Sequence, residues 1–439
     1  MSTTNLRLGV VGTGYVGLTT GACLAHLGHH VVCGDIDSRK IELLQDGRIP
    51  IVEEGLEGIV RDESEAGRLE FVVGSQAAAR DADIVFLCVP TPDGADGSAD
   101  LSYVERAAAE IAPVLAPGTI VVNKSTVPVG STIVVENVIQ RDDILVVSNP
   151  EFLREGSAVT DFLNPDRVVI GATDRDAAER LAEVYQDIQA PVLITDPASA
   201  EAIKYAANGF LAMKISFVNA VAAMCEAVGA DVSAVVAGIG SDRRIGTQFL
   251  NPGPGWGGSC FPKDSRALVK IAEDHGYNFT MMRGVIDVND EQRQRMVDKI
   301  RRACGRDDGD LTGITVAALG LTFKAGTDDL RESPALAIIA DLRRAGAHVR
   351  AFDPTTRAEL SPQQADALAG IELAAELDDV AVDAHVICVF TEWPDFAKVD
   401  LGALAAAARP GAVVVDTRNL LEPDLVREAG LGYDGVGRH

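Results

Sequence analysis

The motif GTGYVG, which lies between an apolar run and a helical stretch near the chain start, supplies glycines at Gly12, Gly14 and Gly17. In a GxGxxG turn the first glycine permits the tight bend and the second lets the backbone approach a pyrophosphate. The third lets the helix pack closely on the strand. The helix start also offers unpaired N–H groups and partial positive charge to phosphate. This stretch therefore predicts a dinucleotide-binding module.

A second strand-like run ends in Asp35, 23 residues after Gly12. A carboxylate at this place is expected to bond ribose hydroxyls and to repel a 2′-phosphate, so the expected cofactor is NAD and not NADP. Asp37 is close enough in sequence to share the role, but Asp35 lies nearer the strand end.

Apolar strand-like runs alternate with Ala-rich helical stretches through the first part of the chain, at residues 6–11, 29–35, 83–90, 119–125, 144–149 and 167–172. We expect an amphipathic helix from the glycine motif to about Leu27. Alternating strands and helices imply a doubly wound parallel sheet. We therefore expect residues 1–197 to form an NAD-binding Rossmann domain.

The middle of the chain is predicted to be helical, and the last part of the chain repeats sequence patterns of the first. Residues 199–229 read as one long helix, and no strand-rich run appears until 314–321. The stretch LGHHVVCGD (27–35) then matches AGAHVRAFD (345–353), and APGTIVVNKST (116–126) matches RPGAVVVDTRN (409–419). The predicted fold class is α/β, with two Rossmann-like doubly wound parallel-sheet domains (1–197 and 312–439) joined by a central helical domain with a long helix (198–305). Because the second copy lacks the glycine motif, we expect it to bind something other than a dinucleotide.

Composition excludes several function classes. The net charge is −26, and such a field repels nucleic acid and anionic membranes. No apolar run approaches the roughly 18 residues of a membrane span and no signal peptide is evident, so we expect a cytoplasmic protein. The seven cysteines include no CxxC pair, and neither a disulfide framework nor a metal site is expected. Any anionic ligand must be held by cations placed close to it.

The loop GWGGSCFPKD (255–264) places Cys260 among glycines and polar residues, whereas Cys33, Cys88 and Cys388 lie in apolar runs. Lys263 is expected to favour the thiolate of Cys260 by lowering its pKa, which is about 8.5 for a free cysteine. A thiolate beside a nicotinamide suits aldehyde oxidation, in which a thioester forms and water cleaves it. Taken alone, the spacing leaves open a loop cysteine without a role.

Longer motifs resemble the UDP-glucose 6-dehydrogenase family, in the family's order and over essentially the whole chain: KSTVPVG (124–130), NPEFLREG (149–156), EAIKYAANGF (201–210), FLNPGPGWGGSCFPKD (249–264) and FKAGTDDLRESPA (323–335). The resemblance implies four-electron oxidation of the C6 alcohol of UDP-glucose to the carboxylate of UDP-glucuronate, with two NAD used in sequence. The same chemistry on GDP-mannose or a UDP-N-acetyl-hexosamine stays open.

The resemblance also implies catalytic roles. Cys260 is expected to form the thiohemiacetal and then the thioester. Lys204 and Asn208, four residues apart on a helix, are expected to face one way and to stabilise the developing oxyanion. Asp264 with Lys204 is assigned to water and proton handling, and Thr126 and Glu151 to ordering a catalytic water.

Binding residues follow in the same way. For NAD the resemblance adds to the derived glycines and Asp35 the residues Tyr15, Val16, Lys40, Thr91, Thr126, Glu155, Lys263 and Arg331. For the UDP-sugar it implies Glu151, Phe152, Leu153, Arg154, Glu155, Lys204, Asn208, Arg244, Phe249, Leu250, Asn251, Pro252, Gly253, Gly257, Lys324 and Arg418. Arg244 is expected to reach across a subunit interface, which implies a homodimer or a higher homo-oligomer. Trp256 and Thr417 depart from the family pattern without removing a reactive group.

Two other readings of the chain are possible. A two-electron dehydrogenase of the hydroxyacid type shares a Rossmann domain followed by long helices, but it needs neither Cys260 nor a second α/β module. A non-catalytic NAD-binding sensor is expected to have lost the thiol, Lys204 or Asn208, and all three are present.

Overall fold

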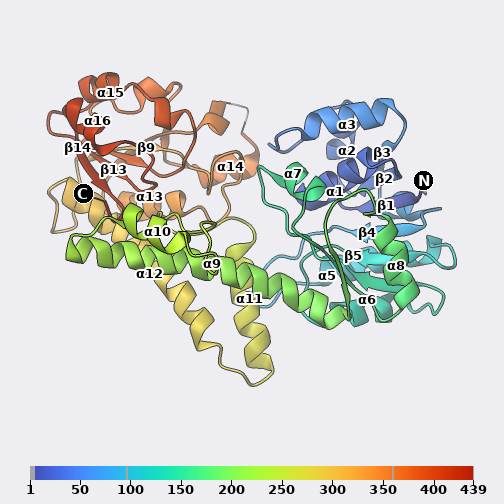
Figure 1. Cartoon of the computed structure of the whole chain (residues 1–439). Coiled ribbons are helices and arrows are strands. Elements are labelled where there is room, and N and C mark those ends of the chain that lie inside the picture. The colour runs from blue at the N-terminus through green and yellow to red at the C-terminus, as the bar shows by residue number, and fades with distance from the viewer. Residues whose placement is uncertain (1–4, 95–96, 358–359, 439) are drawn as a thin grey trace. The chain divides into compact units, whose positions relative to one another are not determined.

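The computed structural model describes residues 5–94, 97–357 and 360–438 of the 439-residue chain. It divides into two compact units, which are described separately. Unit 1 comprises residues 1–207 with 266–277, and unit 2 comprises residues 208–265 with 278–439. Each unit is built around a β-sheet with helices packed against it (Figure 1).

The described part of unit 1 holds an eight-stranded sheet in the order β3-β2-β1-β4-β5-β6-β7-β8. The register is parallel throughout except at β6–β7, where Ser148 pairs antiparallel with Gly171. The strand order reverses between β1 and β4, and ligands of open α/β sheets bind at the carboxyl ends of strands beside such a reversal. The strands are β1 (Arg7–Val11), β2 (His30–Asp35), β3 (Leu69–Val73), β4 (Ile84–Leu87), β5 (Ile120–Asn123), β6 (Leu145–Ser148), β7 (Val168–Gly171) and β8 (Val192–Thr195).

The helix that follows the glycine motif differs from its prediction. Helix α1 was expected to be amphipathic, but it is buried without a break from Gly17 to Ala25, because α3 and α7 pack on it as well as the sheet. The helices of unit 1 are α1 (Tyr15–His26), α2 (Ser38–Gln45), α3 (Leu56–Glu65), α4 (Ser75–Ala79), α5 (Ser102–Ile111), η1 (Ala112–Val114), α6 (Ser131–Ile139), α7 (Ala158–Leu163) and α8 (Arg175–Glu183).

The long predicted helix is α9 (Pro197–Val228), which begins in unit 1 and continues into unit 2. In its first turns the buried Glu201 carboxylate accepts hydrogen bonds from the N–H groups of Gly130 and Thr132, at 2.6 and 3.0 Å. These N–H groups lie at the start of α6 and have no partner within that helix. Glu201 therefore fixes the turn that follows the KSTVPVG motif. Burial raises the pKa of Glu201, and the bonds from Thr132 and Gly130 oppose that rise.

Unit 2 contains a six-stranded parallel sheet, among the described residues, in the order β11-β10-β9-β12-β13-β14. Its strands are β9 (Thr315–Leu319), β10 (His348–Phe352), β11 (Glu372–Leu373), β12 (Val386–Val389), β13 (Val413–Asp416) and β14 (Gly432–Gly435). Its helices are α10 (Val232–Gly240), α12 (Thr280–Ala303), α13 (Pro334–Arg344), η2 (Pro354–Arg357), α14 (Pro362–Ala367), η3 (Leu377–Asp379), η4 (Phe396–Lys398), α15 (Leu401–Ala407) and α16 (Pro423–Glu428). Helix α11 (Phe261–Asp274), like α9, has residues in both units.

The repeat seen in the sequence extends to backbone conformation. Gly12 and Gly320 both have φ of +95°, and each donates its N–H to the second strand of its own sheet, to Gly34 O at 2.7 Å and to Phe352 O at 2.8 Å. Asp353 takes the place of Asp35, but its carboxylate is fully buried and accepts from the N–H of Leu321 at 2.7 Å. No helix follows the turn until α13 begins at Pro334. The second copy therefore lacks the helix start that supports a pyrophosphate.

Candidate active site

The glycine turn of unit 1 has the geometry of a phosphate cradle. Gly12 has positive φ, and a Cβ on Gly17 would lie 1.9 Å from Gly12 O. Gly14 is the N-cap of α1 and no side chain caps this helix start, so its first N–H groups face outward for an anion. Val16 in the first turn packs against the core of the sheet.

Asp35 is held as a carboxylate at the end of β2. Its Oδ2 accepts from Thr13 N at 2.9 Å and from Lys40 Nζ at 3.1 Å, and its Oδ1 accepts from Asp37 N at 3.0 Å. Burial opposes ionisation, but the bonds from Asp37 and Thr13 and the charge of Lys40 outweigh it and lower the pKa of Asp35. Asp37 instead caps α2. Asp35, and not Asp37, thus keeps a carboxylate at the strand end, and its bond to ribose hydroxyls stays a prediction.

Tyr15 joins the glycine turn to the EFLRE segment. Its hydroxyl donates to Glu53, and Gly156 N–H donates to that hydroxyl and to Glu53 Oε2, both at 2.7 Å. Burial, together with the neighbouring Glu53, raises the pKa of Tyr15. Glu53 was missed from the sequence, since nothing in its local pattern marks a buried carboxylate. A second tie, from Thr91 Oγ1 to Thr126 O at 2.9 Å, links the loops that follow β4 and β5.

Glu151 and Lys204 form a buried ion pair in unit 1, with Oε1 and Nζ 2.9 Å apart. Both side chains are less than 5% exposed. The other carboxylate oxygen of Glu151 accepts from Leu153 N at 2.6 Å. The Phe152 ring lies 5.4 Å from Lys204 Nζ and 3.6 Å from the Arg167 guanidinium carbon. The predicted Glu151, Phe152, Leu153 and Lys204 are therefore gathered in one place.

The other parts of this segment lie closer to the surface. Arg154 is exposed and forms an ion pair with Asp161 at 2.5 Å, and Glu155 is half-buried.

Cys260 lies in unit 2, directly before α11, and is half-buried with its Sγ 3.5 Å from Ser259 Oγ. Close by in sequence, the buried Asp264 carboxylate binds two predicted residues: Lys263 Nζ at 2.8 Å and Asn208 Nδ2 at 2.6 Å. Cys33, Cys88 and Cys388 are buried core residues, as expected, and burial raises the pKa of Cys88 to about 12. The Cys260 thiol thus lies next to a polar group, whereas the thiols of Cys33, Cys88 and Cys388 are buried in the core.

Lys204 and Asn208 are one helical turn apart on the continuous helix α9, as the sequence predicted. Each binds a different buried carboxylate within its own unit, Glu151 for Lys204 and Asp264 for Asn208. An amide NH₂ group carries two N–H donors, so the bond to Asp264 leaves Asn208 a second N–H for a ligand.

Four polar side chains that the sequence did not single out clamp the loop before Cys260. Asn289 accepts from Trp256 N at 2.8 Å and donates to Trp256 O at 3.1 Å. Trp256 Nε1 donates to Ser216 Oγ at 2.9 Å. Asn219 and Gln292 bind the N–H and carbonyl of Gly253, at 2.8 and 2.7 Å. All four side chains are at most 2% exposed, so helices α9 and α12 hold this loop through buried hydrogen bonds.

The predicted phosphate-binding cations of unit 2 lie near the same loop. Arg418 donates to the carbonyls of Phe390 and Phe323 and pairs with Glu392, and a Cβ on Gly253 would lie 3.4 Å from Arg418 Nη1. Lys324 Nζ lies 6.0 Å from the centre of the Phe323 ring. Arg418 therefore contacts both Gly253 and the carbonyl of Phe323, which Lys324 follows in the chain.

The remaining predicted residues of unit 2 divide into two groups. Gly258 N–H donates to Arg331 O at 3.2 Å, while the Arg331 guanidinium binds Asp329. The Phe249 ring lies 6.1 Å from that of Phe261, and Leu250, Pro252 and Gly257 are buried or half-buried beside exposed Asn251. The Arg244 side chain, in contrast, is 88% exposed, and its ion pair in the described part of the chain is with nearby Asp242. Its predicted role across a subunit interface stays a prediction.

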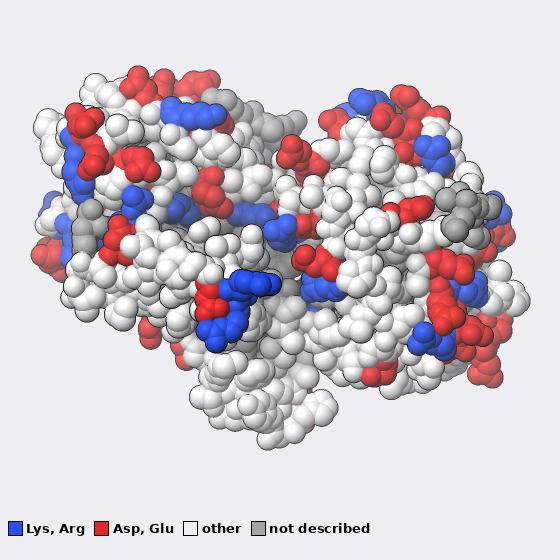
Figure 2. Space-filling model, viewed as in Figure 1, with Lys and Arg blue, Asp and Glu red and all other residues white. Residues whose placement is uncertain are grey.

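The charge on the visible surface is mixed. Figure 2 shows acidic side chains interspersed with basic ones on the face in view. No group of three or more His, Cys, Asp or Glu that could hold a metal ion occurs among residues 5–94, 97–357 and 360–438.

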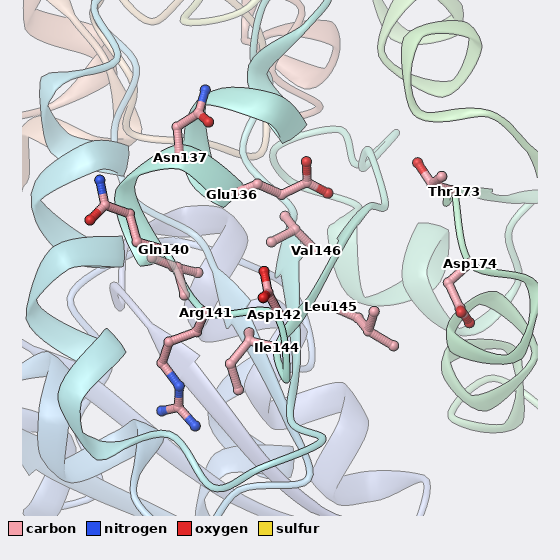
Figure 3. Close-up of a pocket in the computed structure, with 11 residues that line it drawn as sticks. Glu136, Asn137, Gln140, Arg141, Asp142, Ile144, Leu145, Val146, Thr173 and Asp174 are labelled. Atoms are coloured by element: carbon pink, nitrogen blue, oxygen red, sulfur yellow. The ribbon is translucent and has the colours of Figure 1, made fainter.

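A surface cavity of about 770 Å³ in unit 1 is not part of this site (Figure 3). Its lining includes Gln140 at the end of α6, Leu145 at the start of β6, and Asp174 before α8. It therefore lies at the amino end of β6, whereas Glu151 follows the carboxyl end of that strand.

The amide clamp yields a prediction. Asn289→Leu removes both bonds to the Trp256 backbone and leaves two buried main-chain groups unpaired, which destabilises the loop by about 1–3 kcal/mol per group. We expect the Cys260 thiol to react several-fold faster with an alkylating reagent in this variant, measured by mass spectrometry. Asp290→Leu, at an exposed neighbouring position, is the control. An unchanged alkylation rate in Asn289→Leu contradicts the clamp.

Comparison with known proteins places this geometry in a family. Models of the UDP-glucose/GDP-mannose dehydrogenase family match the chain at residues 6–189 (NAD binding domain), 198–291 (central domain) and 317–423 (UDP binding domain). The UDP-glucose 6-dehydrogenase of Rhizobium meliloti (strain 1021) is 44% identical, covering 99% of this chain and 100% of that protein. UDP-glucose 6-dehydrogenase TuaD of Bacillus subtilis (strain 168) is also 44% identical, covering 98% and 93%.

Solved structures agree. A UDP-glucose dehydrogenase from the archaeon Pyrobaculum islandicum superposes with a TM-score of 0.90 at 36% identity, covering 100% of this chain and 99% of that chain. A UDP-D-ManNAc dehydrogenase from Pyrococcus horikoshii gives a TM-score of 0.86 at 26% identity, covering 99% of each chain. The predicted fold class and the predicted cofactor are confirmed. The chain belongs to the UDP-glucose/GDP-mannose dehydrogenase family and is an NAD-dependent dehydrogenase.

Proposed function

We propose that this chain oxidises the C6 alcohol of UDP-glucose to the carboxylate of UDP-glucuronate, with two NAD consumed per sugar. The observation that carries the proposal is the setting of Cys260, a half-buried thiol one helical turn before Asp264, whose buried carboxylate binds Lys263 and Asn208. NAD fits the residues of unit 1. The uncapped start of α1 would bind its phosphates, and the ionised Asp35 would bind a ribose. When bound, NAD supplies the hydride acceptor for each of the two oxidations.

The chain's own residues would supply the covalent chemistry. After the first oxidation, the Cys260 sulfur adds to the C6 aldehyde and forms a thiohemiacetal. The second loss of hydride turns this adduct into a thioester, and water then cleaves the carbon–sulfur bond to release the acid and the thiol. The Lys204 ammonium and the second N–H of Asn208 would stabilise the negative oxygen that develops at C6. Glu151 and Thr126 would order the attacking water, and Asp264 would take up its proton.

UDP-glucose is favoured over other nucleotide sugars by two observations. The relatives at 44% identity are named UDP-glucose 6-dehydrogenases, whereas the UDP-D-ManNAc dehydrogenase is only 26% identical. The FLREG and FLNPG segments also resemble the glucose branch. GDP-mannose and UDP-N-acetyl-hexosamines remain the alternative substrates. We further propose that the chain acts through three segments, at residues 1–197, 198–305 and 312–439, and that it works in the cytoplasm.

The substrate and the electron count are tested together. Purified protein given limiting UDP-glucose should reduce two NAD per sugar, followed by absorbance of the reduced nicotinamide. GDP-mannose and UDP-N-acetylglucosamine serve as comparison substrates and should react at least about tenfold more slowly. A ratio of one NAD per sugar supports a two-electron dehydrogenase, and preference for another sugar reassigns the substrate.

The covalent role of the thiol is tested by Cys260→Ser. Loss of the sulfur nucleophile should reduce acid formation by about three orders of magnitude, because a serine hydroxyl is a much weaker nucleophile at neutral pH. NAD affinity, measured by calorimetry, should not change. Cys304→Ser, at another half-buried cysteine, should retain wild-type turnover. Wild-type turnover in Cys260→Ser rules out the thioester.

A dimer is proposed from the surface of α9. In unit 2 this helix exposes Phe210, Phe217, Met224 and Val228, each more than 50% accessible and spaced by seven or four residues along one face. Helix α9 is also long and apolar enough to cross a membrane by length and composition alone, a test that core helices of soluble proteins pass too. Asn208, Ser216 and Asn219 form hydrogen bonds with residues outside α9, which favours a helix packed within the protein over a membrane-spanning one.

Light scattering tests this assembly. The wild type should elute as a dimer or a larger homo-oligomer, and Phe217→Glu should shift the mass toward the monomer, since a charge on the apolar stripe opposes packing. Leu425→Glu, at an equally exposed apolar residue on α16, should leave the mass unchanged. An active wild-type monomer contradicts the dimer.

A further inference from the structure

Glu53 is a buried carboxylate on the loop between α2 and α3, and the proposed reaction gives it no role. It is 6% exposed and accepts hydrogen bonds from the Tyr15 hydroxyl, from Gly156 N at 2.7 Å and from Val159 N at 3.3 Å. The donors are a phenol and two main-chain N–H groups, and none of these groups is charged. Removing a carboxylate from water is unfavourable unless such donors surround it, so Glu53 holds the segments that supply them close to itself.

These donors come from segments that lie far apart in the chain but belong to the same unit. Tyr15 is the first residue of α1, at the glycine turn that is expected to bind NAD. Gly156 directly follows residues 151–155, which are expected to contact the UDP-sugar and are called the sugar segment below. Val159 lies in the first turn of α7. Glu53 therefore joins the start of the cofactor helix to the end of the sugar segment.

The Tyr15 hydroxyl completes this link. It donates to Glu53, accepts from Gly156 N at 2.7 Å, and lies 3.3 Å from Arg154 O. Burial and the hydrogen bond to Glu53 raise the pKa of Tyr15, so the hydroxyl keeps its proton and remains a donor. Gly156 has φ of +81°, which a glycine adopts without strain, and in this conformation its N–H reaches both acceptors. A movement of residues 154–156 away from α1 would therefore break hydrogen bonds to the start of that helix.

We propose that Glu53 is a positioning residue that holds the sugar segment against the first turn of α1 through the Tyr15 hydroxyl. The proposal rests on the proposed function, because it concerns how UDP-glucose is held. It implies that a change on the cofactor side of the link weakens binding of the sugar nucleotide, although Tyr15 is expected to contact NAD. A carboxylate that only stabilises the fold would lower the free energy of unfolding when replaced and would leave the affinity of the folded protein for UDP-glucose unchanged.

The test is the dissociation constant of UDP-glucose, measured by calorimetry on the full-length protein without NAD, so that no oxidation occurs. Tyr15→Phe removes a single oxygen from the link and should weaken UDP-glucose binding by about five- to tenfold, because the end of the sugar segment loses its tie to α1. The ratio kcat/KM for UDP-glucose at saturating NAD should fall by the same factor, and it replaces calorimetry if the wild type binds the sugar nucleotide only with NAD. An unchanged affinity and an unchanged kcat/KM in Tyr15→Phe overturn the proposal.

A double-variant cycle tests whether Glu53 and Tyr15 act as one unit. Glu53→Gln keeps the size of the side chain but replaces one acceptor oxygen by an NH₂ group, and it should weaken UDP-glucose binding at least as much as Tyr15→Phe. Adding Tyr15→Phe to Glu53→Gln should weaken binding by less than about twofold more, since the link is already broken. Effects that multiply in the double variant show two independent contributions and refute the link.

Two controls separate the link from the stability of the loop. Glu54→Gln, at the exposed neighbouring carboxylate, should bind UDP-glucose like the wild type. Urea titration shows whether each variant is folded; if Glu53→Gln is not, Glu53→Asp, which keeps the charge but shortens the side chain, takes its place in the cycle. An equal loss of affinity in Glu54→Gln assigns the effect to the charge of the loop and contradicts the positioning role.

Failure of this inference is distinguishable from failure of the proposed function. If the wild type neither binds nor oxidises UDP-glucose, the proposed function fails. If the wild type oxidises UDP-glucose and the variants at Tyr15 and Glu53 bind it equally well, only the role of Glu53 is refuted.

Discussion

Three carboxylates of the candidate site, those of Asp35, Glu151 and Asp264, each have a cationic partner, and these contacts organise the site. Glu151 binds Lys204, Asp264 binds Lys263 and Asn208, and the carboxylate of Asp35 binds Lys40 and main-chain N–H groups. An isolated charge removed from water is unfavourable by on the order of several kcal/mol, so each pair offsets a cost that the fold would otherwise carry. The same contacts hold the Lys204 ammonium and the Asn208 amide, the two groups to which the proposed function gives the developing negative oxygen. Folding and proposed chemistry therefore depend on the same contacts.

Much of the fold could be predicted because it rests on local pattern. The glycine motif, Asp35 and the apolar runs identified β1, β2 and β4 to β7, and the internal repeat identified the second sheet. Strands β3 and β8 were missed; they are as long as the strands that were identified, but each bears exposed residues at the edge of the sheet. The amphipathic reading of α1 was wrong, because neighbouring helices cover the side that an isolated sheet layer would leave to solvent. A helix that is buried on all sides has no periodic alternation of apolar and polar residues from which its burial could be predicted.

The site was predicted unevenly for a related reason. Asp35 could be derived from its spacing to Gly12, whereas the roles of Lys204, Asn208 and Asp264 came from resemblance. The amides Asn219, Asn289 and Gln292 escaped notice, since each is a polar residue on a helix and its partner lies about 30–40 residues away in the chain. Long-range hydrogen bonds of single side chains have no signature that one sequence can reveal.

The buried Asp353, which corresponds to Asp35 of the first sheet, shows where the second sheet differs from the first. Its carboxylate now ties together the loop after β9, and no helix starts there until Pro334. Replacing Thr322 and Ala325 by glycine would give residues 320–325 the sequence GxGxxG. It would not give them the N–H groups of a helix start, because no helix begins there. The turn after β9 thus gives a pyrophosphate no helix start, so a nucleotide held by this sheet has to be bound by side chains and not by a row of main-chain N–H groups.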